Sequence, residues 1–128
     1  MLKKILRRII KYYAIKEFSI NDFSLNYVRN IEIIRIDDER IKLIYPHGIL
    51  GEDVLLREQN NLNSIEYMNG TIYYFDFINV SHIDSIGVGY ITKQIKDIKC
   101  VKASYKFINV NNQVKEVFDL LGFNNLLV

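Results

Sequence analysis

The segment that most constrains the fold of this chain is Thr71–Ile78, which reads TIYYFDFI. Its residues are nearly all β-branched or aromatic, which is typical of a central strand that is buried on both faces. The segment that follows repeats apolar residues at helical spacing: Ile86, Val88, Ile91, Ile95 and Ile98. A buried strand that leads into such a helix indicates a crossover unit, so we expect an α/β fold with an at least partly parallel sheet.

Weaker patterns on either side of this unit complete the predicted order of elements. The other predicted elements are strands at 31–36, 41–45 and 103–110, and helices at 52–68 and from Asn111 or Asn112 to Gly122. The polar turn Asp37–Glu39 makes a hairpin of the first two strands. Residues 79–84 are expected to be a connector, and a short tail follows Gly122. Together with an N-terminal helix, the predicted order is α, β, β, α, β, α, β, α.

The size of the chain favours a binding role over catalysis. Its 128 residues fit one domain, and 49% hydrophobic residues are enough for a core. A large enclosed active site is difficult to build at this length. Cys100 is the single cysteine, which fits a reducing compartment. The chain lacks an apolar run of 18 residues and a secretory signal, so we expect a cytoplasmic protein.

The N-terminus carries a basic amphipathic helix pattern. Its apolar stripe is Leu2, Ile5, Leu6, Ile9, Ile10 and Tyr13, and the basic residues between them are Lys3, Lys4, Arg7, Arg8 and Lys11. Residues 1–16 hold six basic side chains and no acidic one, which leaves 11 basic against 15 acidic residues in the rest of the chain. Because the excess of basic over acidic residues is confined to this segment, the domain does not look like a nucleic-acid-binding module.

We therefore divide the chain into a basic helical extension, residues 1–27, and a domain, residues 28–128. Four interpretations of the extension remain open. It could anchor the protein on a membrane surface, dock on an acidic partner or on the acidic body of this chain, form a homodimer, or simply pack on the sheet or a neighbouring subunit.

The turn Val80–Gly89 is the leading candidate for a functional site because it follows the buried strand and opens a helix. Asp84 is expected to cap the free backbone N–H groups of that helix. Gly87 and Gly89 allow another backbone or a partner surface to come close. Ser85 would lie at the positive end of the helix dipole, where a phosphate group is favoured. The alternative is a capped helix start with no further role.

Other site chemistries find weaker support. His82, Asp84 and Ser85 are the residue types of a hydrolase triad, but they are too close in sequence for their side chains to align. Gly87-Val-Gly89 lacks the third glycine of a dinucleotide fingerprint and the Gly-Lys-Ser/Thr of a P-loop. With His47, His82 and Cys100 as the only soft ligands, we expect no metal site, and no cofactor is implied.

Three motifs follow one another along the chain: Ile41–Leu50, Tyr74–Gly89, and Phe107–Val110 with Val114–Leu127. In this order they resemble the STAS domain, the fold of bacterial anti-sigma factor antagonists. Ile41–Leu50 is similar to the family's second strand and Gly-x-Leu turn. Tyr74–Gly89 is similar to its hydrophobic strand and Asp-Ser-(Ser/Thr/Ala)-Gly-Leu-Gly turn. Phe107–Val110 with Val114–Leu127 is similar to its closing strand and Leu-Gly-(Leu/Phe) helix end. The resemblance covers roughly residues 30–128 and implies a mixed β-sheet with crossover helices packed on it.

The resemblance also implies a partner switch in transcription regulation. In the family, a kinase that is also an anti-sigma factor phosphorylates the serine after the aspartate, which is Ser85 here. The implied docking surface is Asp84, Ser85, Ile86, Gly87, Val88 and Gly89, with Gly48 and Leu50. Two departures bear on phosphorylation: Ile86 replaces a small or hydroxylated residue, and Gly51 replaces an aspartate, with Glu52 and Asp53 after it.

The leading hypothesis is a non-catalytic module that binds an anti-sigma factor kinase. The first alternative is a non-phosphorylated STAS subunit of a membrane transporter of the lipid ABC type, which the basic helix and Ile86 favour. An unrelated alternative is a small enzyme or ligand carrier that uses the Gly87–Gly89 turn.

Overall fold

The computed structural model describes residues 28–123 and 126–127. Its strands are β1 (Glu32–Asp37), β2 (Arg40–Ile44), β3 (Gly48–Leu50), β4 (Ile72–Asp76), β5 (Val80–Ile83), β6 (Ser104–Ile108) and β7 (Leu126–Leu127). Its helices are α2 (Glu52–Arg57), α3 (Gln59–Asn63), α4 (Ser85–Cys100) and α5 (Asn112–Leu121). The predicted N-terminal helix and its basic residues lie outside the described residues.

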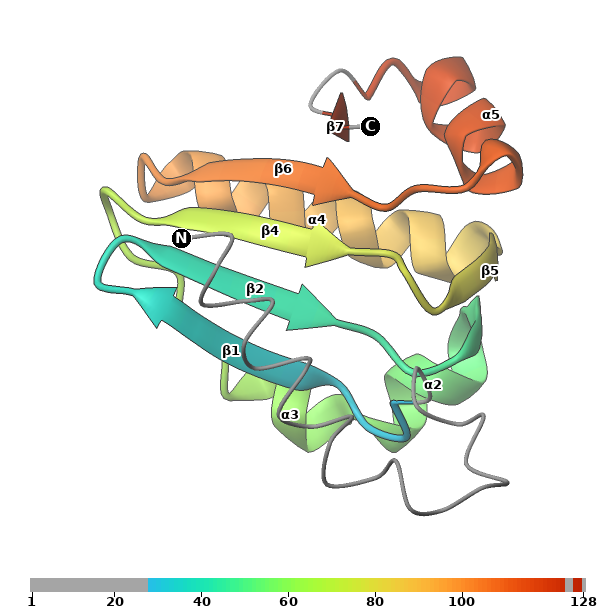
Figure 1. Cartoon of the computed structure of the whole chain (residues 1–128), viewed down its shortest axis with the longest axis horizontal. Coiled ribbons are helices and arrows are strands. Elements are labelled where there is room, and N and C mark those ends of the chain that lie inside the picture. Colours follow the sequence, from blue (N-terminus) through green and yellow to red (C-terminus); the bar gives the residue numbers. More distant parts are fainter. Residues whose placement is uncertain (1–27, 124–125, 128) are drawn as a thin grey trace, which may run out of the picture.

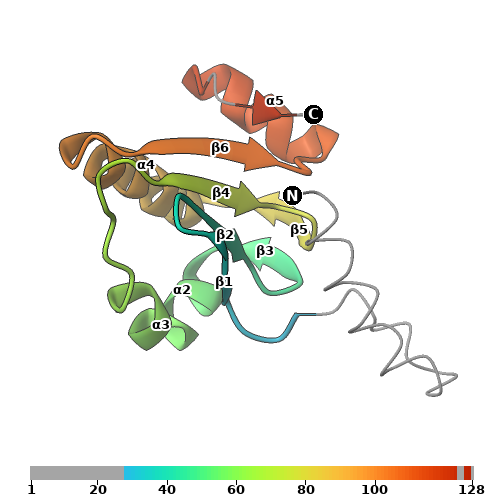
Figure 2. The same ribbon diagram turned by 60° about the vertical axis from the view of Figure 1, so that its left-hand side comes forward.

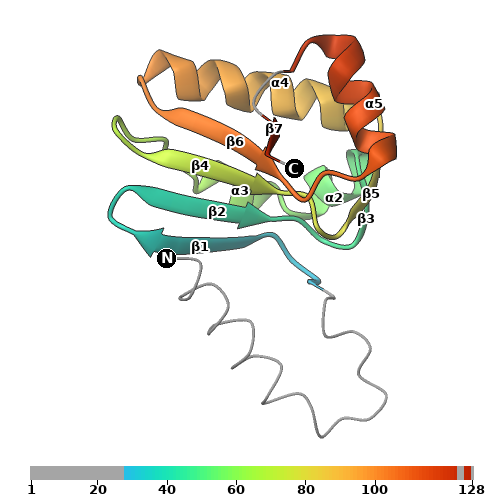
Figure 3. The same cartoon turned by 45° about the horizontal axis from the view of Figure 1, so that its top comes forward.

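The strands form a mixed sheet in the order β1-β2-β4-β6-β7, with β1 antiparallel to β2 and the other pairs parallel (Figure 1). This confirms the expected α/β class and the partly parallel sheet. β3 and β5 form a second, two-stranded parallel sheet. In Figure 3 that small sheet lies beyond the carboxyl ends of β2 and β4.

The helices α2, α3 and α4 lie on one side of the main sheet (Figures 1 and 2). The buried rings on this side are Tyr73 and Phe75 of β4, Phe77 directly after β4, and Tyr105 and Phe107 of β6. From α5, Phe118 contacts the rings of Phe77 and Phe107, with centroids 5.4 and 4.7 Å away. Removing a large side chain of this kind from water contributes about 1.5–3 kcal/mol, so this aromatic layer contributes substantially to stability.

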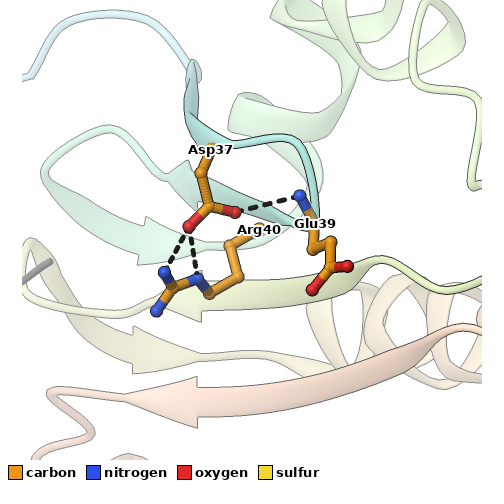
Figure 4. Close-up of polar contacts among 3 residues, drawn as sticks. All are labelled: Asp37, Glu39 and Arg40. Carbon is orange, nitrogen blue, oxygen red and sulfur yellow. Dashed lines mark hydrogen bonds and ion pairs between the residues drawn. The ribbon is translucent and has the colours of Figure 1, made fainter.

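The predicted hairpin is confirmed, and a local charge pair holds its turn (Figure 4). The Asp37 carboxylate accepts hydrogen bonds from Arg40 Nε at 2.8 Å and from the Glu39 backbone N at 2.9 Å. Those two bonds, the one from Arg40 foremost, lower the pKa of Asp37. An aspartate before a tight turn favours this Asx-type geometry.

The last helix is also confirmed at both ends. The Asn111 side chain accepts a hydrogen bond from Val114 N at 2.8 Å, and Gly122 ends the helix at φ 74°. A left-handed residue at this position satisfies the final carbonyls, and glycine adopts it without a steric penalty.

Two predicted boundaries are wrong. The helix predicted over 52–68 ends at Asn63 and is broken at Glu58, the residue between α2 and α3. The Glu58 carboxylate is buried and accepts a hydrogen bond from Ile31 N, so a contact with the start of β1 fixes the break. Asparagines in the short α3 compete with the helical backbone and shorten it further.

The predicted connector at 79–84 contains strand β5, because it pairs with β3. The tail after Gly122 likewise includes β7, which pairs with β6.

Candidate functional site

The strand-to-helix turn at residues 84–89, called the Asp84 turn below, is held by a side-chain cap. Asp84 is the N-cap of α4, and its Oδ1 accepts a hydrogen bond from Gly87 N at 2.8 Å. Such a cap is worth about 1 kcal/mol. The capping that the sequence predicts is confirmed, and Ser85 is the first residue of the helix.

The second strand pair brings the Gly48–Leu50 segment next to this turn. Ile49 pairs with His82 and Leu50 with Ile83, and Asp84 N donates to Leu50 O at 3.3 Å. Gly48 adopts φ 113°, a conformation open to glycine at little cost, and its N–H donates to Asn79 O at 2.9 Å. Two segments that lie more than 30 residues apart in sequence therefore share one surface.

The glycines of the site have different roles. A Cβ on Gly87 would lie 2.0 Å from Leu50 O, so Gly87 is needed for the close approach of α4 to β3. A Cβ on Gly51 would lie 2.1 Å from Asp84 Oδ2. The departure at Gly51 therefore has a steric reason here, since the Asp84 carboxylate occupies the space of a side chain. A Cβ on Gly89 would meet nothing within 4 Å, so Gly89 leaves open space on the helix surface.

The predicted site residues divide into exposed and buried groups. Asp84, Ser85, Ile86 and Gly89 are exposed, whereas Gly87 is buried. Val88 and Gly48 are half-buried. Leu50 is only 1% exposed, so its side chain belongs to the core and its carbonyl positions the turn.

Exposed isoleucines accompany the turn. Ile86 is 50% exposed, and Ile49 and Ile78, from segments joined by the bond between Gly48 and Asn79, are 55% and 56% exposed. Ile49 and Ile78 were not among the residues that the sequence assigned to the site. Ile49 had a detectable signal, because it stands between two residues already assigned to the site.

Acidic side chains lie beside this apolar surface. Glu52 and Asp53 are exposed in the first turn of α2, directly after Gly51, whose Cα faces the Asp84 carboxylate. The surface therefore combines exposed aliphatic groups with the carboxylates of Glu52, Asp53 and Asp84 and with the exposed Ser85.

The arrangement does not provide a hydrolase triad. The Asp84 carboxylate is engaged with Gly87 N, and the His82 ring lies 3.2 Å from Ser81 Oγ, so neither is aligned on Ser85. No group of three His, Cys, Asp or Glu side chains in residues 28–123 is arranged to hold a metal ion. No helix in the described part of the chain is long and apolar enough to cross a membrane.

Behind the turn, α4 is tied to the end of β2. Tyr90 Oη lies 3.1 Å from Tyr45 Oη, and burial raises the pKa of both hydroxyls above the ordinary value for tyrosine. The contact between the two hydroxyls links the first half of α4 to the residue that follows β2.

Residues 57–127, more than half of the chain, match the family model of the STAS domain. The chain therefore belongs to the STAS domain family, as the three motifs indicate. A search of curated protein sequences finds no significant match.

Solved structures agree on the fold. The anti-sigma factor antagonist SpoIIAA in its unphosphorylated form aligns with a TM-score of 0.60 at 16% identity, over 76% of this chain and 85% of that one. The phosphorylated form of SpoIIAA, a Bacillus cell fate determinant, aligns with a TM-score of 0.58 at 15% identity, over 76% of this chain and 88% of that one. A structure described as Mglu aligns with a TM-score of 0.50 at 16% identity, but only 24% of that chain is covered. The STAS-like mixed sheet with packed crossover helices is thus confirmed.

Proposed function

We propose that this STAS domain is a non-catalytic regulatory module that binds a protein partner through the Asp84 turn, as an anti-sigma factor antagonist or a related partner-switch component. The observation that carries the proposal is the exposure of Ser85 and Ile86 on a turn whose backbone is fixed from below. The Asp84 cap and the close approach of Gly87 to Leu50 O restrain the backbone of this turn. A preorganised surface loses little conformational entropy on binding.

The chemistry of the surface supports a protein as the ligand. The half-exposed Ile49, Ile78 and Ile86 offer apolar contacts, and the nearby carboxylates offer charge selectivity. Interfaces commonly combine a small apolar centre with a polar rim. The expected partner is an anti-sigma factor kinase with basic groups facing Asp84, Glu52 and Asp53.

Ser85 is the proposed phosphorylation site within this surface. Its hydroxyl is exposed at the first position of α4, where a kinase could reach it. A phosphate would add about −1.5 to −2 charges next to Asp84 and Ile86 and would weaken docking by repulsion and desolvation. SpoIIAA, which shares the fold, is described in both unphosphorylated and phosphorylated forms.

Affinity measurements with the partner recovered by pull-down from the native cell test this proposal. We expect Ser85→Asp to weaken binding about tenfold or more and Ser85→Ala to leave it unchanged, because only the first adds charge. Thr92→Asp is the matched control, since Thr92 is exposed two turns further along α4.

Two results would contradict the proposal in separate ways. Equal binding by Ser85→Asp and Ser85→Ala would remove the phosphate switch. Unchanged binding by Ile86→Lys, with the exposed Leu120→Lys as its control, would remove docking at the turn itself.

A non-phosphorylated subunit of a membrane transporter is the second candidate. The half-exposed Ile86 favours it, because an apolar side chain beside the serine suits a lasting contact. Recovery of a transporter ATPase or permease, with Ser85 unmodified by mass spectrometry, would support this candidate in place of the first.

A further inference from the structure

The face of the main sheet opposite the core helices carries four apolar or aromatic side chains among two lysines and two acidic residues. Because residues in register share a face, the rows here are Ile34, Lys42, Tyr74 and Lys106, and then Glu32, Ile44, Asp76 and Ile108. We call these eight residues the open face. The described helices contact the other side, through Phe77, Phe107 and their neighbours.

The centre of the open face is nevertheless removed from solvent. Lys42 and Asp76 are each only 4% exposed, Ile44 is 9% exposed, and Lys42 Nζ lies 3.6 Å from Asp76 Oδ2. Asp76 also accepts hydrogen bonds from Asn109 Nδ2 at 2.9 Å and Ile78 N at 3.0 Å. The ion pair accounts for the two charges, but their low exposure indicates that a further layer covers this face.

We propose that the apolar stripe of residues 2–13 packs on the open face and supplies that layer. The stripe consists of Leu2, Ile5, Leu6, Ile9, Ile10 and Tyr13. An amphipathic helix buries such a stripe against an apolar surface and keeps its basic side toward water. The occupant is this chain's own N-terminus, rather than a membrane or a second copy.

The lengths match this placement. A helix over residues 2–13 is about 18 Å long at 1.5 Å per residue, and a five-residue strand such as β2 or β4 is about 16 Å long. The described chain begins at the carboxyl end of β2, where His47 N donates to Val28 O at 3.2 Å. Residues 14–27 can span up to about 45 Å, so they can return the helix over the face.

The charges match as well. A helix that returns from Val28 across the sheet brings Lys3 and Lys4 to the opposite end of β2, where the hairpin turn lies. That turn holds Asp37, Asp38 and Glu39 against the single basic residue Arg40. Figure 4 shows Asp37, Glu39 and Arg40 there. Lys3 and Lys4 would therefore meet the acidic hairpin turn, which favours this direction of packing.

Paramagnetic broadening in the full chain tests the contact. Cys100 is exposed, so Cys100→Ser with Lys11→Cys gives one nitroxide site on the basic side of the stripe. We expect the backbone amide signals of Lys42, Tyr74 and Lys106 to lose intensity severalfold more than those of Lys93, Lys96 and Lys99 in α4. Ile9→Glu in the same background should abolish this difference, whereas Arg7→Gln, on the basic side, should preserve it.

Three results would overturn the proposal. Equal intensities on both sides of the sheet would mean that the extension does not cover the open face. Selective broadening seen only when labelled and isotope-enriched chains are mixed would assign the cover to a second copy. Co-sedimentation with vesicles containing phosphatidylglycerol, together with unbroadened open-face amides, would assign the extension to a membrane surface.

Discussion

At the scale of single residues, Gly87 and Gly89 differ although they are two positions apart on one helix. Gly87 lies against the backbone oxygen of Leu50, and only its lack of a side chain allows β3 to approach α4. Gly89 faces open space. The GVG string in the sequence does not distinguish them, because the neighbour that separates their roles comes from a strand nearly 40 residues earlier.

Alanine at each glycine measures this difference. We expect Gly87→Ala to destabilise the fold by about 2 kcal/mol or more through overpacking against Leu50 O. Gly89→Ala should stabilise it by about 0.5–1 kcal/mol, since alanine is the better helix former and meets nothing. Urea denaturation followed by circular dichroism gives both free energies of unfolding. Equal effects of the two substitutions would disprove the assigned packing.

At the scale of elements, the pairing of β3 with β5 made strands of two segments whose local sequence patterns did not predict strands. Residues 48–50 and 80–83 are short and lack a repeated alternation, so each is ambiguous until the other lies beside it. Glu58 similarly ends α2 because its carboxylate reaches the backbone of Ile31, a contact across 27 residues. The hairpin, β4, α4 and α5, whose signals are local, were predicted from the sequence.

The buried pair between β2 and β4 gives a prediction at this scale. Asp76→Ala leaves Lys42 buried without a partner and should cost about 3–5 kcal/mol. The double variant Lys42→Met with Asp76→Leu should recover part of that loss, because it removes the unpaired lysine charge. It still leaves the Ile78 N–H and the Asn109 amide without their acceptor. Thermal and urea unfolding of the single and double variants form the test. A double variant as unstable as Asp76→Ala would contradict the expected coupling.

At the scale of the whole molecule, one aromatic cluster joins the sheet to α5 and the segment after it. The ring of Phe107 lies within 6.0 Å of the rings of Phe75, Phe77, Tyr105, Phe118 and Phe123. Contacts from β4, β6, α5 and the residue after Gly122 thus converge on a single side chain. Loss of this side chain should loosen all of these elements together.

Phe107→Ala is therefore expected to destabilise the protein by about 3–5 kcal/mol, the range for truncating a buried aromatic side chain. Leu120→Ala is the matched control, since Leu120 is 88% exposed on α5 and should change stability by less than about 0.5 kcal/mol. Calorimetric unfolding compares the two. A similar loss from both variants would contradict the placement of the core.

The sequence by itself determined the α/β class, the capped start of α4 at Asp84 and the family, because periodicity, capping residues and ordered motifs are local signals. Only the tertiary structure decided that Leu50 O contacts the backbone of the Asp84 turn, that Gly51 makes room for the Asp84 carboxylate, and that Ile49 lies beside His82, just before that turn. Those relations depend on strand pairing between segments that are distant in sequence. Local sequence patterns do not reveal such pairing, because each pattern reports only on its own segment.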